Sequence, residues 1–153
     1  MKPIDNLSVL VTGGGSGIGE GIAQLYIEGG AKVTICGRRQ KKIDAVATRL
    51  GKRCLAVQAD ITNEKDRREA VEAAVKHGGK LDVLISNAGN MVRGEIDTLK
   101  EDPLVDIFKT NVIAGMLLTG LCKPHLAKQG GAIIFIGSIH TRRAFPGASA
   151  YAA

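Results

Sequence analysis

Short apolar runs rich in β-branched residues alternate along this sequence with longer segments of helical periodicity. Five runs are predicted to be strands, at residues 7–11, 32–36, 53–58, 81–86 and 132–136. Helices are predicted between them, at about 17–28, 40–50 and 63–78, with one long helix before the last strand. Continuous apolar strands that alternate with helices form a parallel sheet covered on both faces. The sequence therefore predicts an α/β fold with a doubly wound parallel sheet.

Several positions are expected to set the boundaries and faces of the helices. Asn63 is a suitable N-cap for the third helix, and Gly78-Gly79 should stop it. Asp102 is expected to cap the long helix, because Pro103 is favoured at a first helical position, and Pro124 should bend or end it. The expected apolar stripes are Ile18, Ile22 and Leu25 on the first helix and Leu104, Phe108, Gly115, Leu118 and Cys122 on the long one.

Length and charge limit the classes of protein that fit this sequence. The 153 residues suit a single domain, residues 1–153, with no sign of a linker. Lys and Arg exceed Asp and Glu by six, but the basic residues are scattered, and only 3% of residues are aromatic. Because single-strand nucleic-acid binders often rely on stacked aromatic side chains, we expect no nucleic-acid partner. The alternative, a polyanion-binding surface, is the less favoured interpretation.

Cysteine spacing and hydropathy bear on the compartment of the protein. Cys36, Cys54 and Cys122 are odd in number and form no C-x-x-C pair, so reduced thiols in a cytoplasmic protein are expected rather than disulfides or zinc. The three histidines are not clustered, so no metal site is expected. Neither a signal peptide nor an apolar run of the length of a membrane span is found, so no membrane partner is expected.

A glycine-rich loop follows the first predicted strand, reading Thr12-Gly13-Gly14-Gly15-Ser16-Gly17-Ile18-Gly19. Glu20-Gly21 stands where a phosphate loop needs Lys and Ser or Thr, which argues against ATP or GTP hydrolysis. Glycine lets the backbone approach a pyrophosphate, and the N-terminus of the next helix favours an anion. Ligands of doubly wound sheets bind at this edge. A dinucleotide site is therefore predicted, and a tight turn without a ligand is the alternative.

The T-G-x-x-x-G-x-G spacing of this loop resembles that of the short-chain dehydrogenases/reductases. Further matches follow in the family's order: Asp60-Ile61, Asn87-Ala88-Gly89, Asn111, and then Ser138 and Tyr151 thirteen residues apart. Ser86 departs from the asparagine that commonly precedes the N-A-G motif. The resemblance implies a Rossmann-like fold, a nicotinamide cofactor, and Asn111, Ser138 and Tyr151 as catalytic residues. The expected cofactor-binding residues are Gly13, Gly15, Ser16, Gly17, Ile18, Gly19, Arg38, Asp60, Ile61, Asn87, Ala88 and Gly89.

The chemistry of the three proposed catalytic residues suits carbonyl–alcohol redox reactions. Ser138 follows a strand expected to be buried, so its hydroxyl could stabilise a developing oxyanion. Tyr151 could deliver a proton in reduction or remove it in oxidation. Asn111 needs hydrogen-bond partners if it is buried. Each has a simpler alternative: a loop-initiating serine, a packing tyrosine, and an amide that closes a helix bend.

We expect the small-molecule substrate to be a carbonyl compound or a secondary alcohol, and NADP(H) to be preferred over NAD(H). Gly37 stands where an NAD site usually has an acidic residue, and Arg38 could contact a 2′-phosphate. Arg39 could assist this contact or face solvent. His140, with Arg142 and Arg143, could face the substrate or lie in a solvated loop.

The sequence departs from the family pattern at its end, because Tyr151 is followed by only two residues and the family's lysine lies four residues after the tyrosine. We expect this chain to be the N-terminal part of a longer, homo-oligomeric enzyme and to have little turnover alone. Its fifth strand would then be an unpaired apolar edge. A non-catalytic dinucleotide sensor or scaffold is the alternative function.

Overall fold

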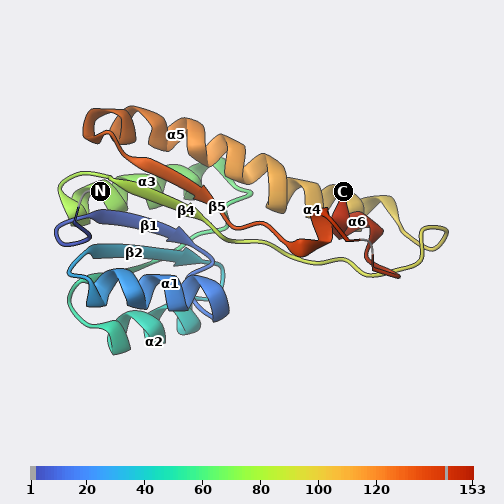
Figure 1. Ribbon diagram of the computed structural model, residues 1–153, viewed down its shortest axis with the longest axis horizontal. Coiled ribbons are helices and arrows are strands. Elements are labelled where there is room, and N and C mark those ends of the chain that lie inside the picture. The colour runs from blue at the N-terminus through green and yellow to red at the C-terminus, as the bar shows by residue number, and fades with distance from the viewer. Residues whose placement is uncertain (1–2, 144) are drawn as a thin grey trace.

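Five parallel strands form one sheet in the order β3-β2-β1-β4-β5 (Figure 1). The structure is a computed structural model that describes residues 3–143 and 145–153. All four neighbouring pairs are parallel, which confirms the predicted α/β fold. The strands are β1 (Ser8–Thr12), β2 (Lys32–Gly37), β3 (Cys54–Gln58), β4 (Val83–Ser86) and β5 (Ala132–Phe135).

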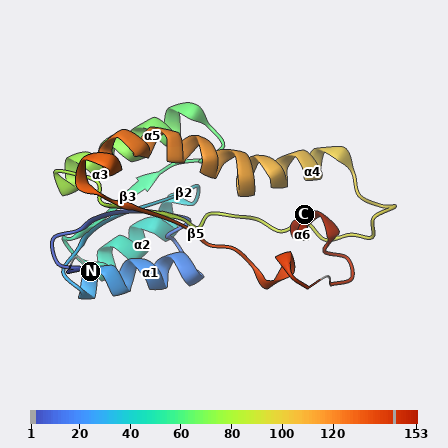
Figure 2. The same cartoon turned by 45° about the horizontal axis from the view of Figure 1, so that its top comes forward.

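Helices cover both faces of the sheet, so the chain forms three layers (Figures 1 and 2). α1 (Gly17–Glu28) and α2 (Gln40–Leu50) lie on one face, and α3 (Glu64–Gly78) and α5 (Ala114–Gln129) lie on the other. Alternate side chains of β1 enter different cores, because successive strand residues point to opposite faces. Val9 and Val11 pack in the core beneath α1 and α2, and Leu10 packs in the core beneath α3 and α5.

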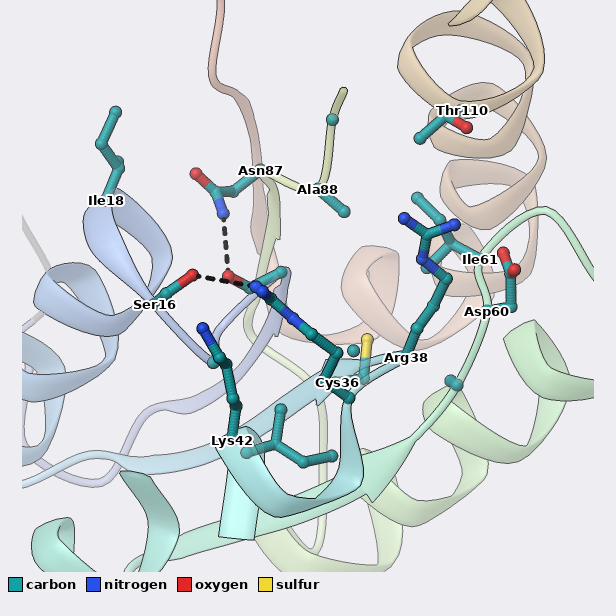
Figure 3. A pocket seen from close by; sticks show the side chains of 17 residues that line it. Ser16, Ile18, Cys36, Arg38, Lys42, Asp60, Ile61, Asn87, Ala88 and Thr110 are labelled. Atoms are coloured by element: carbon teal, nitrogen blue, oxygen red, sulfur yellow. Dashed lines mark hydrogen bonds between the residues drawn. The ribbon is translucent and has the colours of Figure 1, made fainter. Parts of the chain in front are cut away.

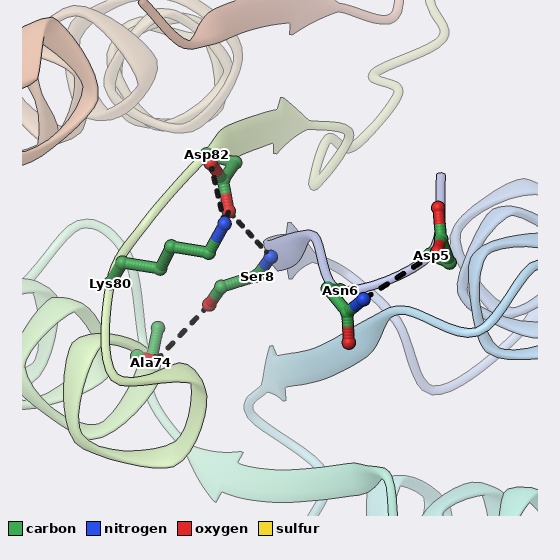
Figure 4. Close-up of polar contacts among 6 residues, drawn as sticks. All are labelled: Asp5, Asn6, Ser8, Ala74, Lys80 and Asp82. Carbon is green, nitrogen blue, oxygen red and sulfur yellow. Dashed lines mark hydrogen bonds and ion pairs between the residues drawn. The ribbon is translucent and has the colours of Figure 1, made fainter. Parts of the chain in front are cut away.

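A polar cluster joins the strands at the edge opposite the glycine-rich loop (Figure 4). The buried carboxylate of Asp82 accepts a hydrogen bond from the main-chain N–H of Ser8 at 2.9 Å and pairs with Lys80 Nζ at 3.0 Å. The hydroxyl of Ser8 donates to the carbonyl oxygen of Ala74 in α3. These contacts link the starts of β1 and β4 to α3, away from the site described below.

The third helix has the predicted boundaries. Asn63 caps it, since its side-chain oxygen accepts from the main-chain N–H of Asp66, and Gly79 ends it in the left-handed conformation. The first helix buries only part of the expected stripe, since Ile22 is half-buried and packs against the core. Its buried residues are Gly19 and Ala23, while Ile18 and Leu25 are exposed, because the close approach of the helix to the sheet favours small residues.

The long helix is built from α4 (Glu101–Phe108), a π-helical turn (Lys109–Ile113) and α5. Its N-cap is Lys100, not Asp102, because the carbonyl of Lys100 already accepts from the main-chain N–H of Leu104. Pro124 does not end the helix, which continues to Gln129. The remaining turns of α5 and its packing on the sheet hold the helical conformation in spite of the missing amide hydrogen.

Only part of the predicted stripe on this helix is buried. Gly115, Leu118 and Cys122 are buried against the sheet, whereas Phe108 is 40% exposed. Figure 2 shows the reason: α4 extends beyond the ends of the strands, where no strand lies beneath it. Ile107 is the buried residue of α4.

By length and mean hydropathy, the helix at residues 101–129 would be long and apolar enough to cross a membrane. No long unbroken run of apolar residues in the sequence indicates such a helix, because polar residues interrupt the segment. A core helix of a soluble protein meets the same two criteria, and this helix packs on β4, β5 and α3. The observation is therefore weak support for a membrane span.

The prediction that β5 is buried is wrong, whereas the expected unpaired apolar edge is what the described residues form. Ile133 and Phe135 are 39% and 52% exposed, because among the described residues β5 pairs with β4 alone and lies at the edge of the sheet. After β5 the chain forms a short 3-10 turn (Ile139–Thr141) and the one-turn helix α6 (Ser149–Ala152), which contacts α4.

Candidate functional site

The glycine-rich loop turns sharply between β1 and α1. Gly13 and Gly17 have φ angles of +68° and +58°, values that side chains other than glycine adopt at a cost. Ser16, the N-cap of α1, makes no side-chain hydrogen bond to the first turn of the helix. Main-chain N–H groups at this end of α1 therefore remain available to an anion, and the helix dipole favours one.

A clamp of hydrogen bonds holds this loop against the end of β4. Thr12 Oγ1 accepts from the main-chain N–H groups of Asn87 and Ala88 at 3.0 and 2.9 Å. Asn87 Nδ2 donates in return to the carbonyl oxygens of Thr12 and Gly13 at 2.9 and 3.4 Å. The loop is also closely packed, because a Cβ atom on Gly19 would lie 2.5 Å from both Asn87 Nδ2 and the Gly13 oxygen.

A pocket of about 520 Å³ opens beside this clamp, at the carboxyl ends of β1 to β4 (Figure 3). This is the edge at which doubly wound sheets bind ligands, and the volume lies in the usual range for small-molecule sites. The residues that line it are Gly13, Gly15, Ser16, Ile18, Cys36, Gly37, Arg38, Arg39, Lys42, Ile43, Ala59, Asp60, Ile61, Asn87, Ala88, Gly89 and Thr110.

Ten of the twelve residues expected to bind a cofactor thus lie around one pocket. The exceptions are Gly17 and Gly19, which shape the loop and do not line the pocket. Sequence analysis missed Lys42, Ile43, Ala59, Cys36 and Thr110 as lining residues. Ala59 and Thr110 could have been predicted, because they are the sequence neighbours of the predicted site residues Asp60 and Asn111.

Three basic side chains stand at one end of the pocket, beyond the end of β2. Arg39 reaches back to the glycine-rich loop, where its Nη2 atom donates to Ser16 Oγ at 3.4 Å. Arg38 and Lys42 are exposed and line the same region. Gly37 ends β2 without a side chain, so no carboxylate comes from that position. This end of the pocket therefore suits an anionic group.

Asp60 is the acidic residue of the pocket. Burial alone would raise the pKa of this carboxyl group. The hydroxyl and the main-chain N–H of Thr62 donate hydrogen bonds to it at 2.7 and 2.9 Å, and Arg38 adds a nearby positive charge. Together these three interactions lower the pKa below its ordinary value of 3.8. The main-chain N–H of Asp60 donates to Asp66 at 2.8 Å. Asp60 is therefore a fixed anion at neutral pH.

Asn111 lies in the π-helical turn and is half-buried. Its Oδ1 accepts from the main-chain N–H of Asn90, and its Nδ2 donates to the carbonyl oxygen of Asn90, both at 2.9 Å. The side chain thus joins the long helix to the loop after β4, beside Gly89. These bonds show that the amide is not merely closing a bend in its own helix.

Ser138 and Tyr151 lie outside the lining of this pocket, on the segment that follows β5. Ser138 Oγ lies 3.1 Å from Nδ1 of His140 and accepts from the main-chain N–H of His140 at 3.3 Å. The ring of His140 meets that of Tyr151 edge-on, with centroids 5.1 Å apart. The structure therefore brings His140 between the two proposed catalytic residues, while Arg142 and Arg143 are exposed.

Among the residues that the structure describes, Cys36 in the pocket is not a reactive thiol, and no metal site is found. Burial, together with the neighbouring Cys122, raises the pKa of the Cys36 thiol to about 12 in spite of a hydrogen bond from the Gly13 backbone. This neutral thiol forms part of the pocket wall. Within residues 3–143 and 145–153, no group of three His, Cys, Asp or Glu side chains is placed to hold a metal ion.

Comparisons with known proteins agree with this geometry. The family model described as short chain dehydrogenase matches residues 8–153. An uncharacterized oxidoreductase of Listeria innocua is 31% identical over 98% of this chain and 62% of its own length. The 3-phenylpropionate-dihydrodiol/cinnamic acid-dihydrodiol dehydrogenase of Escherichia coli is 33% identical over 88% of this chain and 52% of its own length.

A solved structure gives the same result. The 3-ketoacyl-(acyl-carrier-protein) reductase of Brucella melitensis, crystallised with NADH, is 34% identical and superposes with a TM-score of 0.94. The match covers 97% of this chain and 64% of the reductase. The chain thus spans less than two thirds of the length of these relatives. Together with the match to the family model over residues 8–153, these relationships show that the chain belongs to the short-chain dehydrogenase family.

Proposed function

We propose that the protein carrying this chain is an oxidoreductase that transfers a hydride between NADP(H) and a carbonyl compound or secondary alcohol. The observation that carries the proposal is one pocket that joins the glycine-rich loop to a basic end without a carboxylate on β2. The first feature suits a pyrophosphate, and the second suits a 2′-phosphate. A nicotinamide cofactor supplies the hydride when it is bound.

The residues of the pocket fit a dinucleotide. Gly13 and Gly19 let the loop pack tightly against Asn87 and Ala88, and the uncapped N–H groups at the start of α1 suit the pyrophosphate. Asp60 and Ile61, which follow β3, would bound the adenine side. Ala88, whose main-chain N–H donates to Thr12, and Gly89, whose neighbour Asn90 is bound by Asn111, would bound the opposite side.

The preference for NADP(H) rests on charge at the end of β2. An NAD site uses an acidic residue there to accept hydrogen bonds from the ribose hydroxyl, but this chain has Gly37 at that position. Arg38 would bind a 2′-phosphate through charge-assisted hydrogen bonds. Arg39 and Lys42, which line the same end of the pocket, would add positive potential.

Ser138 and Tyr151 are proposed to handle the charge and proton of the reaction. Ser138 would donate a hydrogen bond to the substrate oxygen as negative charge develops on it. Tyr151 would donate its phenolic proton to the same oxygen in reduction and accept one in oxidation. Asn111 is proposed to act in this network through the loop that it holds beside Gly89.

Cofactor affinity provides the first test. Dissociation constants for NADPH and NADH are measured by fluorescence titration, and NADPH is expected to bind at least tenfold more tightly. Arg38→Ala should weaken NADPH binding by about 10- to 100-fold, since one charge-assisted contact contributes about 1.5–3 kcal/mol, and should leave NADH binding unchanged. Lys65→Ala, an exposed cation on α3, is the charge-matched control. Tighter binding of NADH, or equal NADPH affinity in Arg38→Ala, would overturn the preference.

Activity provides the second test, in the protein expressed from its complete gene. Reduction of a panel of aldehydes, ketones and β-keto esters is followed by loss of NADPH absorbance, with Tyr151→Phe as the inactive reference. The first thing to read in the gene is whether lysine stands four residues after Tyr151. A lysine-containing protein that binds NADPH but reduces no carbonyl and oxidises no alcohol would be a dinucleotide sensor instead.

We also propose that the protein is cytoplasmic and that the complete protein is a homo-oligomer. The three cysteines are free thiols, which suits a reducing compartment. The outer side of the long helix exposes Val112, Met116 and Leu117, and exposed apolar side chains of this kind favour association with a second copy. Light scattering after size-exclusion chromatography measures the mass, and a monomer at micromolar concentration would contradict this proposal.

A further inference from the structure

We propose that His140 is a positioning residue, which orients the hydroxyl group of Ser138 toward the reacting oxygen of the substrate. This inference rests on the proposed function, in which Ser138 donates a hydrogen bond to that oxygen. From the sequence, His140 could either face the substrate or lie in a solvated loop. The contacts of its ring argue against the solvated loop.

Two contacts from His140 converge on one oxygen atom. Ser138 Oγ lies 3.1 Å from Nδ1 of the ring and accepts from the main-chain N–H of the same residue at 3.3 Å. A serine hydroxyl has two lone pairs that accept and a single proton that it donates. With a proton on Nδ1, both lone pairs accept from His140. The hydroxyl proton is then left to point away from the histidine, toward substrate.

The opposite arrangement would work against the reaction. If the proton of the imidazole were on Nε2, then Nδ1 would accept the hydroxyl proton of Ser138. That proton would no longer be available to the oxygen on which negative charge develops. The proposal therefore assigns the proton to Nδ1. It also implies that the Nδ1–H donor increases the donor strength of the hydroxyl, because linked hydrogen bonds polarise one another.

The ring of His140 contacts two aromatic side chains. Phe145 packs against it with ring centroids 4.5 Å apart, and Tyr151 meets it edge-on at 5.1 Å. Contacts with two aromatic side chains restrict the orientation of the ring. His140 therefore contacts both proposed catalytic side chains, and its imidazole fixes the Ser138 hydroxyl relative to the Tyr151 ring.

Two variants test the ring contacts of His140 and the hydrogen bond of its Nδ1 atom separately. His140→Phe keeps an aromatic ring against Phe145 and Tyr151 but removes Nδ1, and His140→Asn puts an amide close to the place of Nδ1 without the ring. In the protein from the complete gene, with NADPH and ethyl acetoacetate or 4-nitrobenzaldehyde as probes, His140→Phe should lower kcat by about tenfold. That is the usual effect of one lost hydrogen bond. His140→Asn should recover most of the loss, and His125→Phe on α5 is the control.

A role that acts through Ser138 makes a further prediction. In a Ser138→Ala background, His140→Phe should change kcat by less than twofold, because the group that His140 orients is gone. The KM for NADPH should be unchanged in all variants. The proposal would be overturned if His140→Phe lowered kcat by the same factor in the wild-type and Ser138→Ala backgrounds. It would also be overturned if His140→Phe had the wild-type kcat. If Ser138→Ala itself has wild-type activity, the proposed function of Ser138 fails first.

The protonated nitrogen can also be observed directly, without turnover. Long-range proton–nitrogen correlation spectra distinguish Nδ1–H from Nε2–H, and the His140 signals are assigned by their loss in His140→Asn. We expect Nδ1 to carry a proton, and Ser138→Ala to shift the Nδ1 signal while the signals of His77 and His125 stay in place. A proton found on Nε2 alone would overturn the proposal even if His140→Phe failed to fold.

Discussion

Asn87 and Thr12 bind each other through both their side chains and their main chains. Asn87 Nδ2 donates to the Thr12 carbonyl oxygen at 2.9 Å, and the main-chain N–H of Asn87 donates to Thr12 Oγ1 at 3.0 Å. The Thr12 side chain is fully buried, so water cannot replace these bonds. This reciprocal contact fixes the start of the glycine-rich loop relative to the loop after β4.

Thr12→Val should therefore destabilise the protein and weaken dinucleotide binding. The valine fills the same volume but leaves the N–H groups of Asn87 and Ala88 without their acceptor, at about 1–3 kcal/mol for each buried group. We expect the free energy of unfolding to fall by about 2–4 kcal/mol in urea titrations and the Kd for NADPH to rise about tenfold. Thr12→Ser keeps the hydroxyl and is the control. If Thr12→Val matched Thr12→Ser in both measurements, the clamp would have no energetic role.

Two glycines of α1 form a matched pair for a second prediction. A Cβ atom on Gly19 would lie 2.5 Å from Asn87 Nδ2 and from the Gly13 oxygen, whereas a Cβ atom on Gly21 would meet nothing within 4 Å. Gly19→Ala should therefore push the loop away from Asn87, lower the thermal midpoint and weaken NADPH binding at least tenfold.

Gly21→Ala should leave the Kd unchanged and stabilise the protein by up to about 1 kcal/mol, because alanine has the higher helix propensity. Calorimetry and fluorescence titration measure the two effects. Similar behaviour of the two alanine variants would mean that close packing at Gly19 does not shape the binding site.

The strands and the pocket edge could be predicted because local patterns determine them. β1 and β4 are buried on both faces, which gives continuous apolar runs, and the glycine spacing identifies the loop next to the ligand edge. The basic end of the pocket was only partly predictable. Arg38 follows directly from the end of β2, whereas Lys42 lies in the first turn of α2, and helical periodicity alone does not show that this turn lines the pocket.

Features that depend on contacts between distant segments were not predictable. The π-helical turn is stabilised by the bonds between Asn111 and Asn90, which lie 21 residues apart. His140 looked like a loop residue because its partners, Ser138 and Tyr151, are brought together only when the segment after β5 folds.

The bonds of Asn111 lead to a third prediction, on stability and local opening. Asn111→Ala should lower the free energy of unfolding by about 2 kcal/mol, because two hydrogen bonds to the backbone of Asn90 are lost. Hydrogen exchange at the amide of Asn90 should become faster. Thr119→Val is the control on the same helix: the Thr119 hydroxyl is buried without a hydrogen-bond partner among the described residues, so its removal should be neutral or stabilising. Unchanged exchange at Asn90 would contradict the prediction.

The fourth prediction concerns the pH dependence of the contact between Asp60 and Thr62. The pKa of Asp60 is lowered in the folded protein despite partial burial, since two hydrogen bonds from Thr62 and the charge of Arg38 favour the carboxylate. A carboxyl group with a lowered folded pKa contributes stability above its unfolded pKa and loses that contribution as the pH falls through the folded value. The contribution should therefore be complete at pH 7 and decline below about pH 4.

Thr62→Val removes one of the two donors and should raise the pKa of Asp60 toward its ordinary value. Carbon-13 NMR of the carboxyl group measures this shift, and Arg38→Ala should raise the pKa as well, because a nearby positive charge is lost. In urea titrations, Thr62→Val should be less stable than the wild type at pH 7, and the difference should shrink as the pH approaches 3. Thr141→Val, whose hydroxyl donates to the main-chain carbonyl of Ser138 and not to a carboxylate, should show a difference that does not follow the titration of Asp60. A difference for Thr62→Val that stayed constant between pH 7 and pH 3 would show that its hydroxyl does not act through the ionised Asp60.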